Sequence, residues 1–143
     1  MNAANHFHYS LLRYCDLRRE ESLVVGVLII FPKDKVIRFL HPEHLERLQA
    51  AFPGCPVQTI RGYFEGFGLR AVQKSLQDLV FPDSATEAAG FISTHFLTED
   101  SSALQFSEPR TVALTQPNID RIAQNFYERY LQTYDPINAP ALI

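Results

Sequence analysis

The sequence has little cysteine, no long hydrophobic run and no excess of positive charge. Its two cysteines, Cys15 and Cys55, cannot form a disulfide-rich scaffold or, by themselves, a four-ligand zinc site. The longest apolar run, Leu23 to Phe31, is much shorter than the roughly 20 residues of a membrane helix. A formal net charge of -3 argues against binding to nucleic acid by bulk electrostatics, so we expect no nucleic-acid partner.

The amino-terminal residues also lack the basic region and following apolar stretch of a secretory signal. The 143 residues fit one domain, because domains most often contain about 100–150 residues. The sequence therefore predicts a single cytoplasmic domain over residues 1–143, without a membrane-spanning segment.

Motifs that would identify a common enzyme class are missing as well. The chain contains no G-x-S-x-G, no H-E-x-x-H, no P-loop and no kinase catalytic-loop signature. His6 and His8 would share one side of a strand, and His41 and His44 could share a helical face. A catalytic zinc ion usually needs three protein ligands, and the sequence fixes no third ligand for either pair. We therefore expect solvated side chains at His6 and His8, no metal and no cofactor.

Three strands are predicted in the first forty residues. The run from Leu23 to Phe31 is apolar without alternation and rich in Val and Ile, which suits a central strand covered on both faces. Residues 7–15 form the strand before it, and residues 36–40 form the strand after the turn at residues 32–35. Because the connections are short, the three strands should form an antiparallel meander.

Two helical segments are predicted next. The first begins at His41, with Pro42 at the first helical position, and ends at Pro53. In the second, the apolar stripe consists of Val57, Ile60, Phe64, Phe67 and Ala71, and past Gly68 it shifts to Leu69, Val72, Leu76 and Leu79. Each glycine inside a helix costs about 1 kcal/mol relative to Ala, so we expect a bend or two helices near residues 66–68.

The last third of the chain contains two short strands and one clear helix. Residues 81–102 show no firm pattern beyond a short helix over 87–96. Residues 103–106 and 111–114 read as strands around a turn with Pro109, and because proline is unfavourable inside a central strand we expect this pair at a sheet edge or with a bulge there. The final helix places Ile119, Ile122, Phe126 and Tyr130 on one side, with Asn118 or Thr115 as its cap.

The predicted fold class is therefore α+β. It consists of an antiparallel sheet, with an N-terminal three-strand meander and a C-terminal strand pair, and of helices packed on that sheet.

Neither cysteine is predicted to act as a nucleophile. Cys15 lies near Arg13, Arg18 and Arg19, which would favour a thiolate, but no histidine is paired with it in the sequence. We interpret Cys15 as a small buried apolar residue and Cys55 as an exposed loop thiol.

The connector between the first two strands carries the main polar cluster, which consists of Arg18, Arg19, Glu20 and Glu21. Arg13 lies on a strand that is predicted to be buried on both faces, and a buried guanidinium must be paired. Glu21 is the nearest candidate across the hairpin. We favour a salt bridge that fixes the hairpin register, and the functional alternative is contact with an anionic ligand or a partner.

Two segments resemble a bacterial family of unknown function, domain family 3037. Residues 9–14 (YSLLRY) and 18–31 (RREESLVVGVLIIF) are similar to the start of that family, and the positions that match its pattern are Arg13, Tyr14, Arg19, Glu21, Val25, Gly26 and Val27. Val24 stands where the family has Asn. Residues 104–114 (LQFSEPRTVAL) and the helix after them are similar to its C-terminal strand, Pro-Arg turn and last helix. The resemblance implies association with HipA-like kinases, as in toxin–antitoxin modules.

The leading hypothesis is a non-enzymatic binding or regulatory module, with a HipA-like kinase or another protein as its partner. The candidate binding residues are Arg13, Arg19, Glu21 and Arg110. The alternative is a small enzyme or ligand-binding protein that acts on a phosphorylated or nucleotide substrate through its arginines, with Glu21 or a histidine as general base. A nucleic-acid binder is the least favoured interpretation, and the sequence does not predict an oligomeric state.

Overall fold

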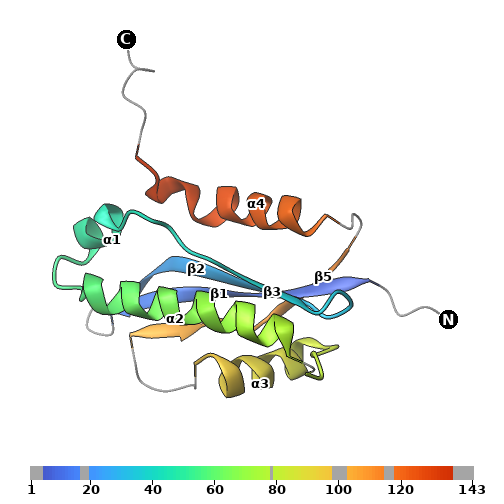
Figure 1. Ribbon diagram of the computed structural model, residues 1–143. Coiled ribbons are helices and arrows are strands. Elements are labelled where there is room, and N and C mark those ends of the chain that lie inside the picture. Colours follow the sequence, from blue (N-terminus) through green and yellow to red (C-terminus); the bar gives the residue numbers. More distant parts are fainter. Residues whose placement is uncertain (1–4, 17–19, 78, 98–102, 115–117, 137–143) are drawn as a thin grey trace, which may run out of the picture.

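An antiparallel sheet forms the centre of the structure (Figure 1). The computed structural model describes residues 5–16, 20–77, 79–97, 103–114 and 118–136. In this part of the chain the sheet has five strands: β1 (His6–Asp16), β2 (Glu21–Phe31), β3 (Val36–Leu40), β4 (Leu104–Phe106) and β5 (Arg110–Ala113). Their order is β3-β2-β1-β4, and β5 also pairs with β1. The predicted three-strand meander and the α+β class are confirmed.

Strand β2 is the central strand that its uninterrupted apolar run predicts. Val25 to Phe31 are all buried, because β1 and β3 flank the strand and helices cover the faces of the sheet. One register shift interrupts its pairing with β1, since Leu12 lies opposite Gly26 whereas Arg13 lies opposite Val24. This β-bulge leaves Val25 as the extra residue and bends the strand locally.

The two C-terminal strands lie end to end along β1 and do not pair with each other. β4 pairs with residues 12–14 of β1, and β5 pairs with residues 6–9. Ser107 connects them, because its backbone N–H donates to Leu11 O (2.8 Å) and its carbonyl accepts from the Ser10 hydroxyl (2.6 Å). The turn with Pro109 therefore lies at a sheet edge, as predicted.

Helices cover both faces of the sheet and give three layers (Figure 1). α4 (Ile119–Tyr130) lies on one face, and α2 (Val57–Leu76) and α3 (Ala85–His95) lie on the other. α1 (Glu46–Ala51) precedes α2, and a short 3-10 helix, η1 (Gln132–Tyr134), follows α4. None of the helices in the described ranges has both the length and the apolar character that crossing a bilayer requires.

The predicted apolar stripe and cap of α4 are present. Phe126 contacts the rings of Phe7 and Tyr9 on β1, with centroid distances of 5.8 and 4.7 Å. The Asn118 side chain accepts a hydrogen bond from Arg121 N at 3.0 Å and caps the helix. Thr115, the other candidate cap, lies outside the described residues.

The predicted start of the first helix is wrong. α1 begins at Glu46 rather than at Pro42, and it has no side-chain cap. Pro42 is buried, and the ring of the preceding His41 stacks on Phe64 of α2 with a centroid distance of 4.9 Å. Proline at a first helical position is favourable but not required, and here the packing of this segment against α2 determines its conformation.

The bend predicted at residues 66–68 is also wrong. α2 is a single helix of 20 residues, and its sheet-facing side consists of Ile60, Phe64, Phe67 and Ala71. Because this one stripe contacts the sheet along the whole helix, its burial outweighs the helix penalty of the glycines. Of the predicted second stripe, only Leu79 packs against the core, and it lies beyond the end of α2. Leu69, Val72 and Leu76 are 59%, 59% and 83% exposed.

Gly26 is required by close packing between β2 and β3. A Cβ atom at this position would lie 3.0 Å from Phe39 Cζ and 3.1 Å from Leu40 O. One of these contacts is to the backbone of β3, so the sheet would have to shift to accept a side chain.

Candidate functional site

The three predicted ligand-binding residues that the structure describes, Arg13, Glu21 and Arg110, are spread along the length of β1. Arg110 lies opposite Tyr9 on β1, and Glu21 lies opposite Asp16. These two positions are seven residues apart on β1, which corresponds to about 23 Å at 3.3 Å per residue. Arg13 lies between them, and Arg19 lies outside the described residues. This spacing does not favour recognition of one phosphorylated ligand by Arg13, Glu21 and Arg110 together.

Arg13 and Glu21 are not cross-strand neighbours, so the predicted hairpin salt bridge is wrong. The register places Arg13 opposite Val24, and side chains three positions apart on a strand point to opposite faces of the sheet. Glu21 therefore shares a face with Asp16, whereas Arg13 lies on the other face. Arg13 is only half-buried, so its guanidinium does not require the ionic partner that was expected from the sequence.

His8 is a fully buried histidine on β1, contrary to the predicted solvated side chain. Its Nε2 lies 3.0 Å from Pro82 O, and its Nδ1 lies 2.9 Å from the hydroxyl of Thr111. Since a carbonyl only accepts, Nε2 carries the proton in the neutral ring and Nδ1 accepts from Thr111. Burial lowers the pKa of His8, and the hydrogen bond to Pro82 acts in the opposite direction.

The histidine pair predicted on β1 is adjacent in space, with ring centroids of His6 and His8 5.0 Å apart. Within the described residues, no three His, Cys, Asp or Glu side chains come together in a way that could hold a metal ion. Both nitrogens of His8 already have protein partners.

Neither cysteine lies in the environment predicted for it. Cys55 is buried, whereas the sequence indicated an exposed loop thiol, and Cys15 is half-buried rather than buried. Burial raises the pKa of both thiols, although Arg13 lowers that of Cys15 somewhat. Burial therefore favours the protonated thiol at both positions.

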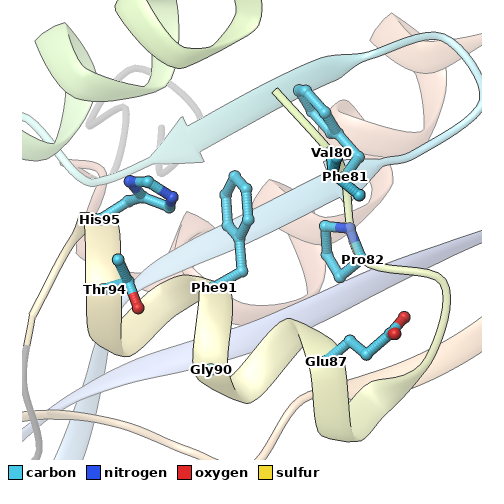
Figure 2. A pocket seen from close by; sticks show the side chains of 8 residues that line it. All are labelled: Val80, Phe81, Pro82, Glu87, Gly90, Phe91, Thr94 and His95. Atoms are coloured by element: carbon cyan, nitrogen blue, oxygen red, sulfur yellow. The ribbon is translucent and has the colours of Figure 1, made fainter. Parts of the chain in front are cut away.

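A hollow of about 290 Å³ lies between the segment at residues 80–82 and α3 (Figure 2). We call it the α3 hollow, and its lining residues are Val80, Phe81, Pro82, Glu87, Gly90, Phe91, Thr94 and His95. Figure 2 shows Phe91 and His95 projecting from α3 beside the segment that carries Val80 and Phe81. The rings of Phe81 and Phe91 lie 5.7 Å apart, and those of Phe91 and His95 lie 4.6 Å apart. The rings of Phe81, Phe91 and His95 thus line one part of the hollow, and Val80, which also lines it, is 94% exposed.

One local and one long-range hydrogen-bond system hold the segments that line the hollow. Ser84 caps α3 by accepting from Glu87 N (3.1 Å), and the Glu87 carboxylate accepts from Asp83 N (2.8 Å). This is a variant of the capping box, and it fixes the turn that leads into α3. His8 holds the other wall through Pro82 O. Burial lowers the pKa of His95, with a further decrease from Lys74, so His95 is neutral at pH 7.

This hollow was not predicted from the sequence, because residues 81–102 show no firm pattern. The signal that was available is the sequence Ser84-Ala-Thr-Glu87, which has the spacing of a capping box and predicts a helix start at residue 85.

The exposure of the second apolar stripe on α2 could also have been predicted from the sequence. A continuous helix with two apolar stripes on different sides can bury only one of them against a single sheet.

These features define a three-layer α+β protein that carries a hollow lined in part by aromatic rings and an exposed apolar helix face. The sequence model of the family described as a protein of unknown function, DUF3037, matches residues 9–130. The chain therefore belongs to DUF3037. No curated protein and no solved structure matches it.

Proposed function

We propose that this protein is a binding module rather than an enzyme, and that it recognises another protein through the α3 hollow. The observation that carries this proposal is the α3 hollow itself, whose lining combines the rings of Phe81 and Phe91 with Val80, an aliphatic residue that is 94% exposed. A single exposed aliphatic residue is ordinary on a protein surface, but next to a concave site it can contact an aromatic or aliphatic anchor of a partner.

The polar groups next to the hollow support binding more than turnover. The Glu87 carboxylate accepts a backbone hydrogen bond from Asp83, and both nitrogens of His8 have partners in β5 and in the segment at residue 82. Groups that hold the walls in place are poorly suited to exchange protons with a substrate.

The charges at the hollow indicate what the partner should present. Glu87 lines the hollow, Asp83 directly follows Pro82 of its lining, and both carboxylates are exposed. A partner segment with an apolar anchor and an adjacent Lys or Arg would complement this arrangement. The first candidate is a HipA-like kinase, as the family resemblance suggested, and this protein would then act as its regulator in the bacterial cytoplasm, as part of a toxin–antitoxin module.

The test is binding of the purified chain to a HipA-like kinase encoded beside it, measured by isothermal titration calorimetry. Val80→Glu should weaken binding at least tenfold, because it places a charge in the apolar part of the lining. Val72→Glu is the matched control, since it makes the same substitution at an exposed position of α2 away from the hollow. No heat of binding at about 100 µM of both folded proteins would count against the kinase, and equal loss in both variants would count against the hollow.

A further inference from the structure

The outer face of α2 is an exposed apolar surface that the proposed function does not use. Leu69, Val72 and Leu76 fall within an arc of about 60° at 100° per residue, so they form one continuous stripe. We call these three residues the α2 stripe. They lie on the side of the helix away from the buried, sheet-facing residues, and each is more than half exposed.

Two glycines lie beside this stripe, one and two turns towards the start of the helix. A Cβ atom at Gly62 or Gly66 would meet no atom of the described chain within 4 Å. Folding of this chain therefore gives no steric reason for glycine, which is among the least favourable residues inside a helix. Both glycines also line a hollow of about 280 Å³, together with Tyr63, Phe67 and Arg70 among others.

The stripe and the glycines are related by a mirror pattern about Leu69. Val72 and Leu76 follow Leu69 by three and seven residues, and Gly66 and Gly62 precede it by three and seven. A two-fold axis through Leu69 would bring a second α2 helix alongside in the antiparallel direction. Val72 would then lie against the second copy's Gly66, Leu76 against its Gly62, and the two Leu69 side chains against each other. On either side of the central Leu69 pair, large residues would meet small ones, and this pattern is self-complementary, as a two-fold interface requires.

The charges on this face are compatible with such a pair. In this register Glu65 faces the second copy's Gln73, whose amide can donate to the carboxylate. The two Glu65 side chains would be about 12 Å apart along the helix axis, at 1.5 Å per residue, and would repel each other only weakly.

We propose that α2 is a homodimerisation surface, and that the occupant of the α2 stripe is the α2 helix of a second copy in antiparallel orientation. α2 is about 30 Å long, and a helix contact about 10 Å wide would bury roughly 300 Å² per copy. Stable complexes bury about 800 Å² per partner. The dimer is therefore weak, with a dissociation constant between about 10 µM and about 1 mM.

The first experiment is sedimentation equilibrium of the full chain at protein concentrations from about 10 µM to about 1 mM. The wild-type protein should change from monomer to dimer over this range. Val72→Glu should weaken the association at least tenfold, whereas Val80→Glu, the same substitution at an exposed residue outside α2, should leave it unchanged. A wild-type monomer at the highest concentration, or a Val72→Glu variant that still dimerises, would overturn the proposal.

The second experiment tests the register by disulfide cross-linking with diamide as oxidant. Leu69→Cys should cross-link with itself, because the two-fold axis passes through this position. Val72→Cys should not, since its two copies would be about 9 Å apart along the axis. A mixture of Val72→Cys and Gly66→Cys should give the mixed dimer. The unsubstituted chain, which has Cys15 and Cys55, gives the background. Cross-linking of Val72→Cys as efficient as that of Leu69→Cys would overturn the antiparallel register.

The two variants also separate this inference from the proposed function. Loss of kinase binding only in Val80→Glu and loss of dimerisation only in Val72→Glu would support both surfaces. Failure of the kinase experiment would leave the sedimentation result to decide the inference by itself.

Discussion

Removal of the Tyr134 hydroxyl should destabilise the fold, because this group fixes η1 to the β-bulge of β2. The hydroxyl donates to Val24 O at 2.6 Å, and Tyr134 is only 5% exposed. Tyr134→Phe would take a hydrogen bond from the carbonyl of Val24, in a contact that is partly buried. A hydrogen bond of this kind contributes about 0.5–1.5 kcal/mol, so the free energy of unfolding should fall by that amount.

The measurement is urea unfolding at pH 7, followed by far-UV circular dichroism because the chain has no tryptophan. The matched control is Tyr63→Phe, the same change at a residue that is 41% exposed, which should alter the free energy of unfolding by less than about 0.5 kcal/mol. Equal losses in the free energy of unfolding for Tyr134→Phe and Tyr63→Phe would refute the stabilising role assigned to the Tyr134 hydroxyl.

The same variant gives a second result at alkaline pH. Burial raises the pKa of Tyr134 to about 12, against the ordinary value of 10. The Tyr134 hydroxyl therefore stays protonated to a higher pH in the folded state than in the unfolded state. Its contribution to the free energy of unfolding is complete below pH 10 and is lost as the pH rises through about 12. The full difference corresponds to about 3 kcal/mol. The free-energy difference between wild type and Tyr134→Phe should shrink over this window. Burial, with the neighbouring Asp135, also raises the pKa of Tyr127 to about 12. Because Tyr127 is present in wild type and in Tyr134→Phe, its effect cancels in the free-energy difference between them. A difference that is independent of pH would contradict the assignment.

Three further predictions concern single positions. Gly26→Ala should lower the free energy of unfolding by about 1–3 kcal/mol, because its Cβ would press on Phe39 and on the backbone of β3, and urea unfolding measures this loss. Gly66→Ala should raise it by about 0.5–1 kcal/mol in the dilute monomer, since the added methyl group meets nothing there and alanine favours the helix; a lower melting temperature would be inconsistent with this. The pKa of His8 is lowered by burial, so its contribution to stability is present above pH 6.5 and is lost as the pH falls through the folded-state pKa. Unfolding midpoints measured on both sides of pH 6.5 should therefore depend less on pH in His8→Gln than in wild type.

The sequence predicted the elements whose burial follows from local pattern. The uninterrupted apolar run of β2 indicates a strand that is buried on both faces of the sheet. The 3.6-residue repeat of Ile119, Ile122 and Phe126 indicates a helix with one apolar side that packs on a neighbouring element. Both elements could therefore be assigned correctly. The errors came where packing between distant segments decided the outcome. The start of α1 depends on the contact of His41 with Phe64, and the continuity of α2 depends on its contact with the sheet.

The candidate site was less predictable for a related reason. Whether Arg13 meets Glu21 depends on strand register, and the local sequence hint of the bulge at Val25, the adjacent Gly26, does not fix that register. The α3 hollow joins the segment at Val80 to α3, and its wall is held by His8, which is more than seventy residues earlier in the chain. Histidine near a chain terminus gives no local indication that it will be buried. Residue types can suggest a site only when neighbouring elements bring them together, and here long-range contacts form the hollow.

The two proposed surfaces lie on the same layer of the molecule, so their relative orientation determines whether partner and second copy compete. Arg70 Nη1 donates to Phe96 O at 2.8 Å, which shows that the Arg70 side of α2 faces the end of α3. Val72 is two residues later, and at 100° per residue its side chain points about 160° away from that of Arg70. The α2 stripe therefore points away from the α3 hollow, and a second copy on the stripe would leave Val80 accessible. Because independent sites bind without mutual inhibition, the kinase should bind the dimer as well as the monomer and give a two-to-two complex at high concentration. Sedimentation of the mixture measures this, and dissociation of the dimer by the kinase would show that the two surfaces overlap.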